Sequence, residues 1–205
     1  MATWKIFAPI AVGNTVVMKP SENTPLTALK LGSILAEMLP PGVVNIVTGR
    51  GQTVGQALGE HPDINMMSIT GDVTTGQKVL QAATGNLKRT HLELGGKAPV
   101  IVMADADLEA VVATVRSAGF YNAGQDCCAA CRIYVHESVH DTLVAALKEA
   151  VSSIKLGPTD QAGTELGPLI SARQRERVAG FVDRAKDQSH IQVITGGKHV
   201  AGDGF

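Results

Sequence analysis

The sequence predicts an α/β fold in which mainly parallel sheets are covered by helices on both faces. Short runs rich in β-branched residues alternate with longer amphipathic stretches along the whole chain. Strands that alternate with helices in this way are typical of βαβ units. With 205 residues, 44% hydrophobic and 18% charged, the chain also has the composition of a folded protein with a substantial core.

The first strand is expected at residues 15–18 and is followed by a helix from Thr24. Thr24 can accept a hydrogen bond from the free N–H groups of the first turn, and Pro25 suits the first helical position. Pro40-Pro41-Gly42 is expected to end the helix. Its apolar side is predicted to consist of Leu26, Leu29, Ile34 and Leu35.

The same alternation continues to the end of the recognisable pattern. Strands are expected at residues 43–47, 66–69, 99–102 and 132–135. Helices are expected near Val54, from Thr74, and around Leu108, Val111, Val112 and Val115. A last helix is predicted from apolar residues at helical spacing, namely Val139, Leu143, Leu147, Val151 and Ile154.

Charge and cysteine content restrict the partners and the compartment. A net charge of −1 leaves no basic surface for nucleic acid or anionic lipid, so a small-molecule partner is expected. The apolar stretch near the start is interrupted by Lys5, Gly13 and Asn14 and is too short to span a membrane. The three cysteines fall within five positions and cannot link distant segments, which favours reduced thiols in the cytoplasm.

Two motifs carry chemistry. Gly124-Gln125-Asp126-Cys127 offers a thiol, and it stands 127 − 93 = 34 residues after Glu93 in the segment His91-Leu92-Glu93-Leu94-Gly95-Gly96-Lys97. A thiolate can add to a carbonyl, and a carboxylate can remove a proton from water. Taken alone, Cys127 would be a small buried residue and Glu93 an ordinary surface carboxylate.

Together with Lys19-Pro20-Ser21-Glu22, these motifs resemble the NAD(P)-dependent aldehyde dehydrogenase superfamily over the whole chain. The residues around Cys127 are most similar to bacterial 4-aminobutyraldehyde dehydrogenases. The resemblance implies that Cys127 is the catalytic nucleophile and Glu93 the general base. It also implies part of the family's fold, with residues 1–94 from the C-terminal part of the NAD-binding domain and 95–205 from the N-terminal part of the catalytic domain.

The resemblance further implies a cofactor site. Lys19, Ser21 and Glu22 would bind the adenosine ribose, and because a carboxylate would repel a 2′-phosphate, NAD is favoured over NADP. Gly71, Asp72 and Gly76 would face the pyrophosphate at the start of a helix, and Gly51 and Leu94 complete the expected cofactor contacts. The family usually has Ser at position 72, so Asp72 would weaken phosphate binding unless it caps the helix and points away.

Trp4, Phe120 and Tyr121 match family positions that line the aldehyde tunnel, and Asp126 could supply a countercharge to an amino aldehyde. Betaine aldehyde or a medium-chain neutral aldehyde is the alternative substrate. A non-catalytic dinucleotide-binding chain and a thiol redox pair at Cys128 and Cys131 are alternatives from other classes. No metal site is expected, because no paired His or fourth ligand accompanies the cysteines.

The chain is also expected to cover less than half of a full-length family member. The Pro-Trp-Asn segment that helps hold the oxyanion and the Glu-x-Phe-Gly-Pro segment that binds the nicotinamide ribose are both absent from the sequence. On this expectation the chain itself could be inactive, whereas the full-length form would be a homo-oligomer.

Overall fold

The structure is a computed structural model that describes residues 1–200 and residue 202. Its chain divides into two compact units, the first comprising Met1–Gly95 and the second beginning at Gly96. The division lies next to the expected domain boundary at residue 94. That the units belong to a cofactor domain and a catalytic domain, respectively, stays a prediction.

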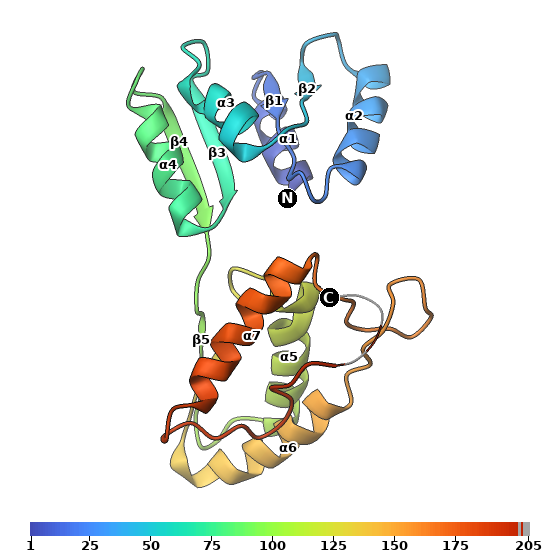
Figure 1. The fold of residues 1–205 in the computed structure, drawn as a ribbon, viewed down its shortest axis with the longest axis vertical. Helices are drawn as coiled ribbons and strands as arrows, with labels where there is room; N and C mark the ends of the chain where they lie inside the picture. The colour runs from blue at the N-terminus through green and yellow to red at the C-terminus, as the bar shows by residue number, and fades with distance from the viewer. Residues whose placement is uncertain (201, 203–205) are drawn as a thin grey trace. The chain divides into compact units, whose positions relative to one another are not determined.

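The first unit contains all the elements expected before residue 95 (Figure 1). The helix expected near Val54 is a π-helical turn continued by a short α-helix, and a helix before the first strand and a strand that ends at Leu94 are additional. In chain order they are α1 (Ala2–Ala11), β1 (Val16–Met18), α2 (Leu26–Met38), β2 (Val44–Ile46), the π-helical turn η1 (Gly51–Gly55), α3 (Gln56–Glu60), β3 (Met66–Gly71), α4 (Val73–Ala83) and β4 (Arg89–Leu94).

The strands of this unit form two parallel pairs. β1 pairs with β2 so that Met18 lies opposite Ile46, and β3 pairs with β4 so that Gly71 lies opposite Leu94. Because α2 connects the first pair and α4 connects the second, each pair is a βαβ unit. The carboxyl ends of both strands in a pair therefore meet at one edge, where open α/β folds bind ligands.

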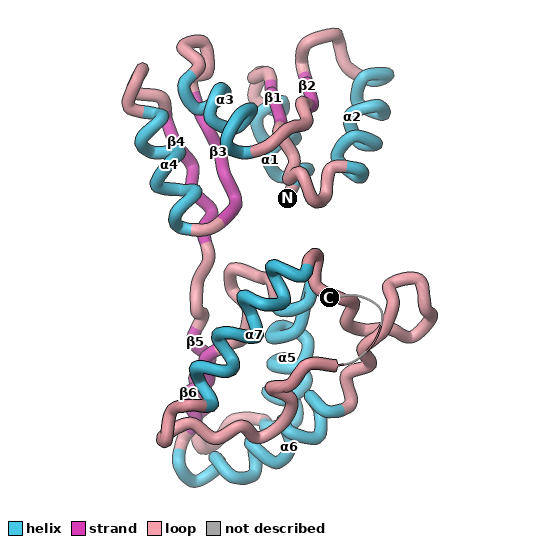
Figure 2. The backbone as a smooth tube through the Cα atoms, viewed as in Figure 1, coloured by secondary structure: helices cyan, strands magenta, loops and turns pink. Residues whose placement is uncertain are grey.

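The second unit has the same construction around one parallel pair (Figure 2). Its elements are β5 (Pro99–Val102), α5 (Leu108–Phe120), the 3₁₀ turn η2 (Tyr121–Gly124), β6 (Arg132–Val135), the 3₁₀ turn η3 (Glu137–Val139), α6 (His140–Ser152) and α7 (Ala172–Lys186). β5 and β6 pair with Pro99 opposite Arg132, and α5 packs against α6. The predicted α/β class with parallel strand pairs is confirmed.

Each unit buries a few apolar side chains. In the first unit, Ile6 of α1, Leu35 of α2 and Val79 of α4 are buried; in the second, Val102 of β5 and Leu143 of α6 are almost inaccessible to solvent. Gly76 of α4 permits close packing in the first unit, because a Cβ at this position would lie only 2.9 Å from Leu94 Cδ2. The helix can therefore cover the end of β4.

The prediction for the start of α2 was wrong in two respects. The helix begins at Leu26, and its N-cap is Pro25, which makes no side-chain hydrogen bond. Thr24 lies before the N-cap, in a separate turn that its backbone N–H closes by donating to Ser21 O at 3.1 Å. Of the predicted apolar side only Leu35 is buried, whereas Leu26 is 78% exposed.

Within the part of the chain that the structure describes, no helix is both long enough and apolar enough to cross a membrane.

Candidate active site

Cys127 follows a left-handed turn at the end of α5. Asn122, Ala123 and Gly124 have φ values of 51°, 57° and 73°. Side chains lock this turn, because Asn122 Nδ2 donates to Gln125 O at 3.1 Å and Gln125 Nε2 donates to Asn122 O at 3.3 Å. Gly124 and Gln125 of the motif thus have a structural role. They form the turn after which the Cys127 thiol is exposed.

Gly96 lies against the backbone of Cys127. A Cβ at Gly96 would lie 2.8 Å from Cys127 O, a distance that real side chains do not adopt. Any residue other than glycine at this position would push the cysteine segment away. The second glycine of the Glu93-Leu94-Gly95-Gly96 motif is therefore needed for the position of Cys127 within the second unit.

The thiols of Cys127 and Cys128 are neighbours, with their sulfur atoms 3.7 Å apart. The Asp126 carboxylate accepts from Cys128 N at 3.3 Å and from Cys128 Sγ at 3.6 Å. These hydrogen bonds, with that of the Cys128 backbone N–H first, lower the pKa of Asp126. The Cys127 thiol and then the negative charge of Asp126 raise the pKa of Cys128.

Glu93 lies at the carboxyl end of β4 in the first unit, opposite Thr70 of β3. It belongs to a chain of polar contacts. Lys5 Nζ donates to Ser68 Oγ at 2.6 Å, Ser68 Oγ lies 2.9 Å from His91 Nδ1, and His91 Nε2 lies 2.9 Å from Glu93 Oε1. All three hydrogen bonds can form together when Ser68 donates to His91 Nδ1 and His91 Nε2 donates to Glu93.

Sequence reasoning treated His91 as an ordinary surface residue and did not single out Lys5 or Ser68. The signal for His91 was available, since residues two apart on a strand share a face and His91 precedes Glu93 by two. The contacts of Lys5 and Ser68 depend on how α1 and β3 pack and cannot be obtained from spacing. Burial lowers the pKa of Lys5, and the negative charge of Glu93 partly offsets this shift.

The predicted ribose-binding residues meet at the end of β1. Lys19 Nζ lies 3.7 Å from Glu22 Oε2 and donates to Pro20 O at 2.7 Å and to Gly49 O at 3.4 Å. The pKa of Glu22 is lowered, first by its own backbone N–H and then by Lys19. An ionised carboxylate beside an ammonium group is well suited to bind the two hydroxyl groups of a ribose.

Asp72 is the N-cap of α4, and its carboxylate accepts from Thr75 N at 2.7 Å. In this capping geometry the carboxylate points toward the backbone N–H groups of the helix that it begins. Gly71 and Gly76 flank the cap, and Leu94 packs on Gly76. The expected pyrophosphate residues and Leu94 are thus adjacent in the structure, at the carboxyl edge of the β3–β4 pair.

Gly51 begins the π-helical turn η1, directly after β2 and the loop that follows it. Gly49, two residues earlier, has φ 151°, and a Cβ there would lie 2.4 Å from Val54 Cγ2. The loop after β2 therefore depends on glycine for its path. Because Gly49 O accepts from Lys19, this loop lies beside the Lys19–Glu22 pair.

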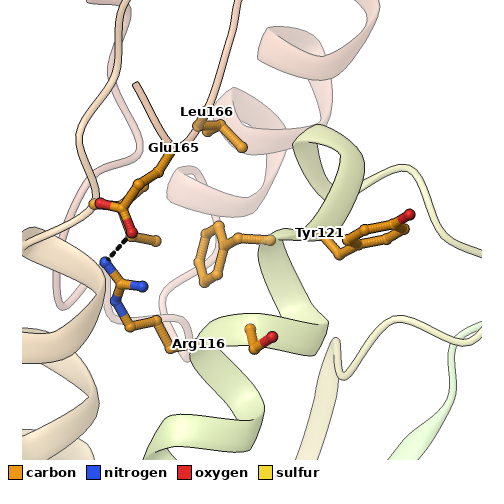
Figure 3. Close-up of a pocket in the computed structure, with 7 residues that line it drawn as sticks. Arg116, Tyr121, Glu165 and Leu166 are labelled. Atoms are coloured by element: carbon orange, nitrogen blue, oxygen red, sulfur yellow. Dashed lines mark hydrogen bonds and ion pairs between the residues drawn. The ribbon is translucent and has the colours of Figure 1, made fainter. Parts of the chain in front are cut away.

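The predicted aromatic residues Phe120 and Tyr121 line a cavity of about 150 Å³ in the second unit. Figure 3 shows the cavity with an ion pair between Arg116 Nη2 and Glu165 Oε1, 2.6 Å apart. The pKa of Glu165 is lowered by the Lys155 backbone N–H and then by Arg116. The remaining lining residues are Ser117, Ile154 and Leu166.

The four predicted substrate residues do not form one group within a unit. Trp4 lies in α1 of the first unit and is 74% exposed. Asp126 belongs to the second unit but is not among the residues that line the cavity of Phe120 and Tyr121. Sequence reasoning also missed Arg116 and Glu165, because their pairing across 49 positions follows from tertiary packing.

Comparison with known proteins gives consistent matches over the entire chain. The model of the family described as "Aldehyde dehydrogenase family" matches residues 1–205. A mitochondrial aldehyde dehydrogenase of Leishmania tarentolae is 43% identical over 100% of this chain and 41% of its own length. The betaine aldehyde dehydrogenase of Bacillus subtilis (strain 168) is 46% identical over 96% of this chain and 40% of its own length.

A solved structure also matches both units. The betaine aldehyde dehydrogenase of Staphylococcus aureus, a point mutant in complex with NAD+, aligns with a TM-score of 0.93 and 38% sequence identity. The alignment covers 98% of this chain and 41% of that one. The chain thus spans about two fifths of the length of these relatives.

Proposed function

The chain belongs to the aldehyde dehydrogenase family, and from this premise we propose that its residues serve the oxidation of an aldehyde to a carboxylic acid with NAD. Cys127 is the proposed nucleophile and Glu93 the proposed general base. The observation that carries this proposal is the exposed Cys127 thiol on a side-chain-locked turn, in a chain that matches the family along its whole length.

In the proposed reaction the Cys127 sulfur adds to the carbonyl carbon and forms a thiohemiacetal. The oxygen of the substrate becomes negatively charged in this step, and the backbone N–H of Cys127 is one donor that can stabilise it. Loss of hydride from the thiohemiacetal leaves a thioester on the sulfur. NAD, when bound, supplies the acceptor for that hydride.

Glu93 would then take a proton from the water that attacks the thioester, which releases the acid and returns the thiol. His91 would orient Glu93, because its Nε2 lies 2.9 Å from Glu93 Oε1. Ser68 holds the other side of the His91 ring at Nδ1, and Lys5 in turn donates to Ser68 Oγ. We assign His91 and Ser68 as positioning residues in this step.

The residues present are compatible with NAD. Lys19 and Glu22 form a charged pair that suits a ribose with two free hydroxyl groups. Gly71 directly precedes the N-cap of α4 and carries no side chain, Gly76 lets Leu94 pack on the helix, and the N-cap geometry of Asp72 directs its carboxylate to Thr75 N. Gly51 begins η1 in the loop region after β2, two residues from Gly49, whose carbonyl accepts from Lys19, and Leu94 ends β4 and packs on Gly76.

For the substrate we favour an aldehyde with a cationic nitrogen, specifically 4-aminobutyraldehyde. Phe120 and Tyr121 support this choice, since aromatic faces attract cations, and Asp126 adds a negative charge close to Cys127. Betaine aldehyde is the second candidate, supported by the 46% identity to a betaine aldehyde dehydrogenase. Assembly of the complete protein into a homo-oligomer and a cytoplasmic location stay predictions.

The test is NADH formation by the gene product as it is encoded in its source. Rates should be compared for 4-aminobutyraldehyde, betaine aldehyde and a neutral aldehyde of similar length. Cys127→Ser should lower kcat by more than about a thousandfold because the nucleophile is lost. Cys131→Ser, a matched change of an exposed thiol, should leave the rate unchanged. Equal loss in both variants, or activity retained in Cys127→Ser, would refute the assignment.

A further inference from the structure

The second thiol beside Cys127 has no part in the proposed oxidation. Cys127 Sγ and Cys128 Sγ are 3.7 Å apart, and Cys128 Sγ lies 3.6 Å from Asp126 Oδ1. One ligand atom from each of these three residues lies within 4.8 Å of both others. We call this group the Asp126–Cys127–Cys128 cluster. Cys131, although close in sequence, is not part of it.

These separations agree with those between ligands of one tetrahedral metal ion. Two sulfur atoms at about 2.3 Å from zinc, at an angle of about 109°, are about 3.8 Å apart. A sulfur atom at that distance and a carboxylate oxygen at about 2.1 Å are about 3.6 Å apart. The observed 3.7 Å and 3.6 Å match these two separations. The third pair, Cys127 Sγ and the Asp126 carboxylate, lies within 4.8 Å, so side-chain rotation has to bring it to a similar separation.

We propose that the Asp126–Cys127–Cys128 cluster binds a soft divalent cation of the zinc class through two thiolates and one carboxylate, with water in the fourth position. Both thiols are exposed, so an ion can reach them from solvent. The turn before them is held by the reciprocal hydrogen bonds of Asn122 and Gln125, which reduces the entropy lost on binding. Thiolate ligands are those that zinc and related soft ions prefer.

No metal site is expected from the sequence, because neither paired histidines nor a fourth ligand stands beside the three cysteines. In the structure the Asp126 carboxylate folds back onto Cys128, so that two thiols and one carboxylate form the cluster and Cys131 lies outside it. Binding involves no oxidation or reduction. The cation forms bonds to both sulfurs, the two thiol protons pass to the solvent, and the carboxylate joins as an anion.

One consequence rests on the proposed function. A cation on Cys127 Sγ occupies the electron pair that would attack the aldehyde, so zinc would inhibit the complete enzyme and a chelator would restore its activity. Inhibition and binding are separate readouts. Binding to the 205-residue chain can be measured whether or not the chain oxidises aldehydes.

The experiment uses the 205-residue chain, reduced with a phosphine, and zinc alone as the probe in competition with a chromophoric chelator. We expect one zinc ion per chain, and with cadmium the charge-transfer absorption of a metal–thiolate bond. Cys128→Ser should weaken binding by more than about a hundredfold, since even outer ligands of metal sites contribute tenfold to a hundredfold. Asp126→Asn should weaken binding by about tenfold.

Cys131→Ser is the matched control and should bind zinc as the unchanged chain does. Alkylation provides a second readout, because all three thiols are exposed and should react without metal. With zinc bound, peptide mass spectrometry should show Cys127 and Cys128 protected and Cys131 still alkylated. The proposal is overturned if Cys128→Ser binds zinc as tightly as the unchanged chain, if Cys131→Ser weakens binding as much, or if zinc protects Cys131 instead.

Discussion

Ala123 has left-handed backbone angles, φ 57° and ψ 36°, four residues before Cys127. Its Cβ makes this conformation cost about 1–2 kcal/mol, whereas asparagine and glycine, which flank it, tolerate the region. The strained residue lies in the turn that leads to Cys127. The position of the Cys127 thiol therefore depends on this unfavourable backbone conformation. Side-chain hydrogen bonds of Asn122 and Gln125 hold the turn against this cost.

Ala123→Gly should therefore raise the free energy of unfolding, by up to about 1 kcal/mol, because glycine removes the steric penalty. The matched control is Ala113→Gly in the middle of α5, where the same change should lower it by about 1 kcal/mol. Urea unfolding followed by circular dichroism measures both. A loss of stability in Ala123→Gly equal to that in Ala113→Gly would show that the turn carries no strain.

Residue identity and spacing indicated some contacts of the candidate site and not others. The roles of Cys127 and Glu93 stay predictions from motifs in the sequence, whereas Asp72 has the capping geometry that the sequence raised as one possibility. The contact of His91 with Glu93 was overlooked, although strand periodicity places both on one face. The Arg116–Glu165 pair joins positions far apart in the chain and depends on tertiary packing, which no local pattern encodes.

At the scale of elements, α3 depends on a buried lysine. Lys88 is only 7% exposed, and its Nζ donates to Gly59 O at 2.6 Å and His61 O at 2.8 Å. These carbonyls lie at the C-terminal end of α3, where helix N–H groups are not available to pair with them and a positive charge is favourable. The short helix α3 is thereby tied to the segment that leads into β4.

Lys88→Met should destabilise the first unit by about 2–3 kcal/mol, because it keeps the chain length but leaves both carbonyls without their charged donor. Lys78→Met in α4 changes an exposed lysine and should alter stability by less than about 0.5 kcal/mol. Denaturant unfolding, with hydrogen exchange of the α3 amides, measures the effect. Unchanged exchange in Lys88→Met would contradict the assigned role of the lysine.

Element prediction succeeded where apolar periodicity was strong. The helices expected from Thr74, around Leu108 and after Val139 are α4, α5 and α6. α1 was missed because Pro9 and the interrupting polar residues concealed it, yet Pro9 lies inside the helix. α7 was missed because five of its fifteen residues are lysine or arginine and none of its residues is buried, so that it has no strong apolar pattern.

At the scale of the whole chain, both units present large apolar side chains to solvent. In the first unit Leu26 is 78%, Leu87 87% and Val12 76% exposed. In the second, Ile101 of β5 is 71% exposed. Each such side chain left in water forgoes about 1.5–3 kcal/mol of burial free energy, which favours association.

The 205-residue chain in isolation should therefore self-associate with rising concentration and bind a hydrophobic dye. Sedimentation velocity measures the association, and the emission of Trp4, the only tryptophan, reports its covering because this side chain is 74% exposed. Replacing Leu26 and Val12 by glutamine should reduce both the self-association and the dye binding. A chain that stays monomeric and binds no dye at all concentrations would refute this prediction.

The proposed function requires that Cys127 and Glu93 act in succession on one aldehyde. The direct test uses the complete gene product with the change Glu93→Gln. This protein is mixed with NAD and 4-aminobutyraldehyde and then analysed by peptide mass spectrometry. We expect an acyl group to accumulate on the Cys127 peptide because hydrolysis of the thioester has lost its base, with NADH formed in an amount equal to the protein. A Cys127 peptide that remains unmodified while turnover continues would refute the roles proposed for Cys127 and Glu93.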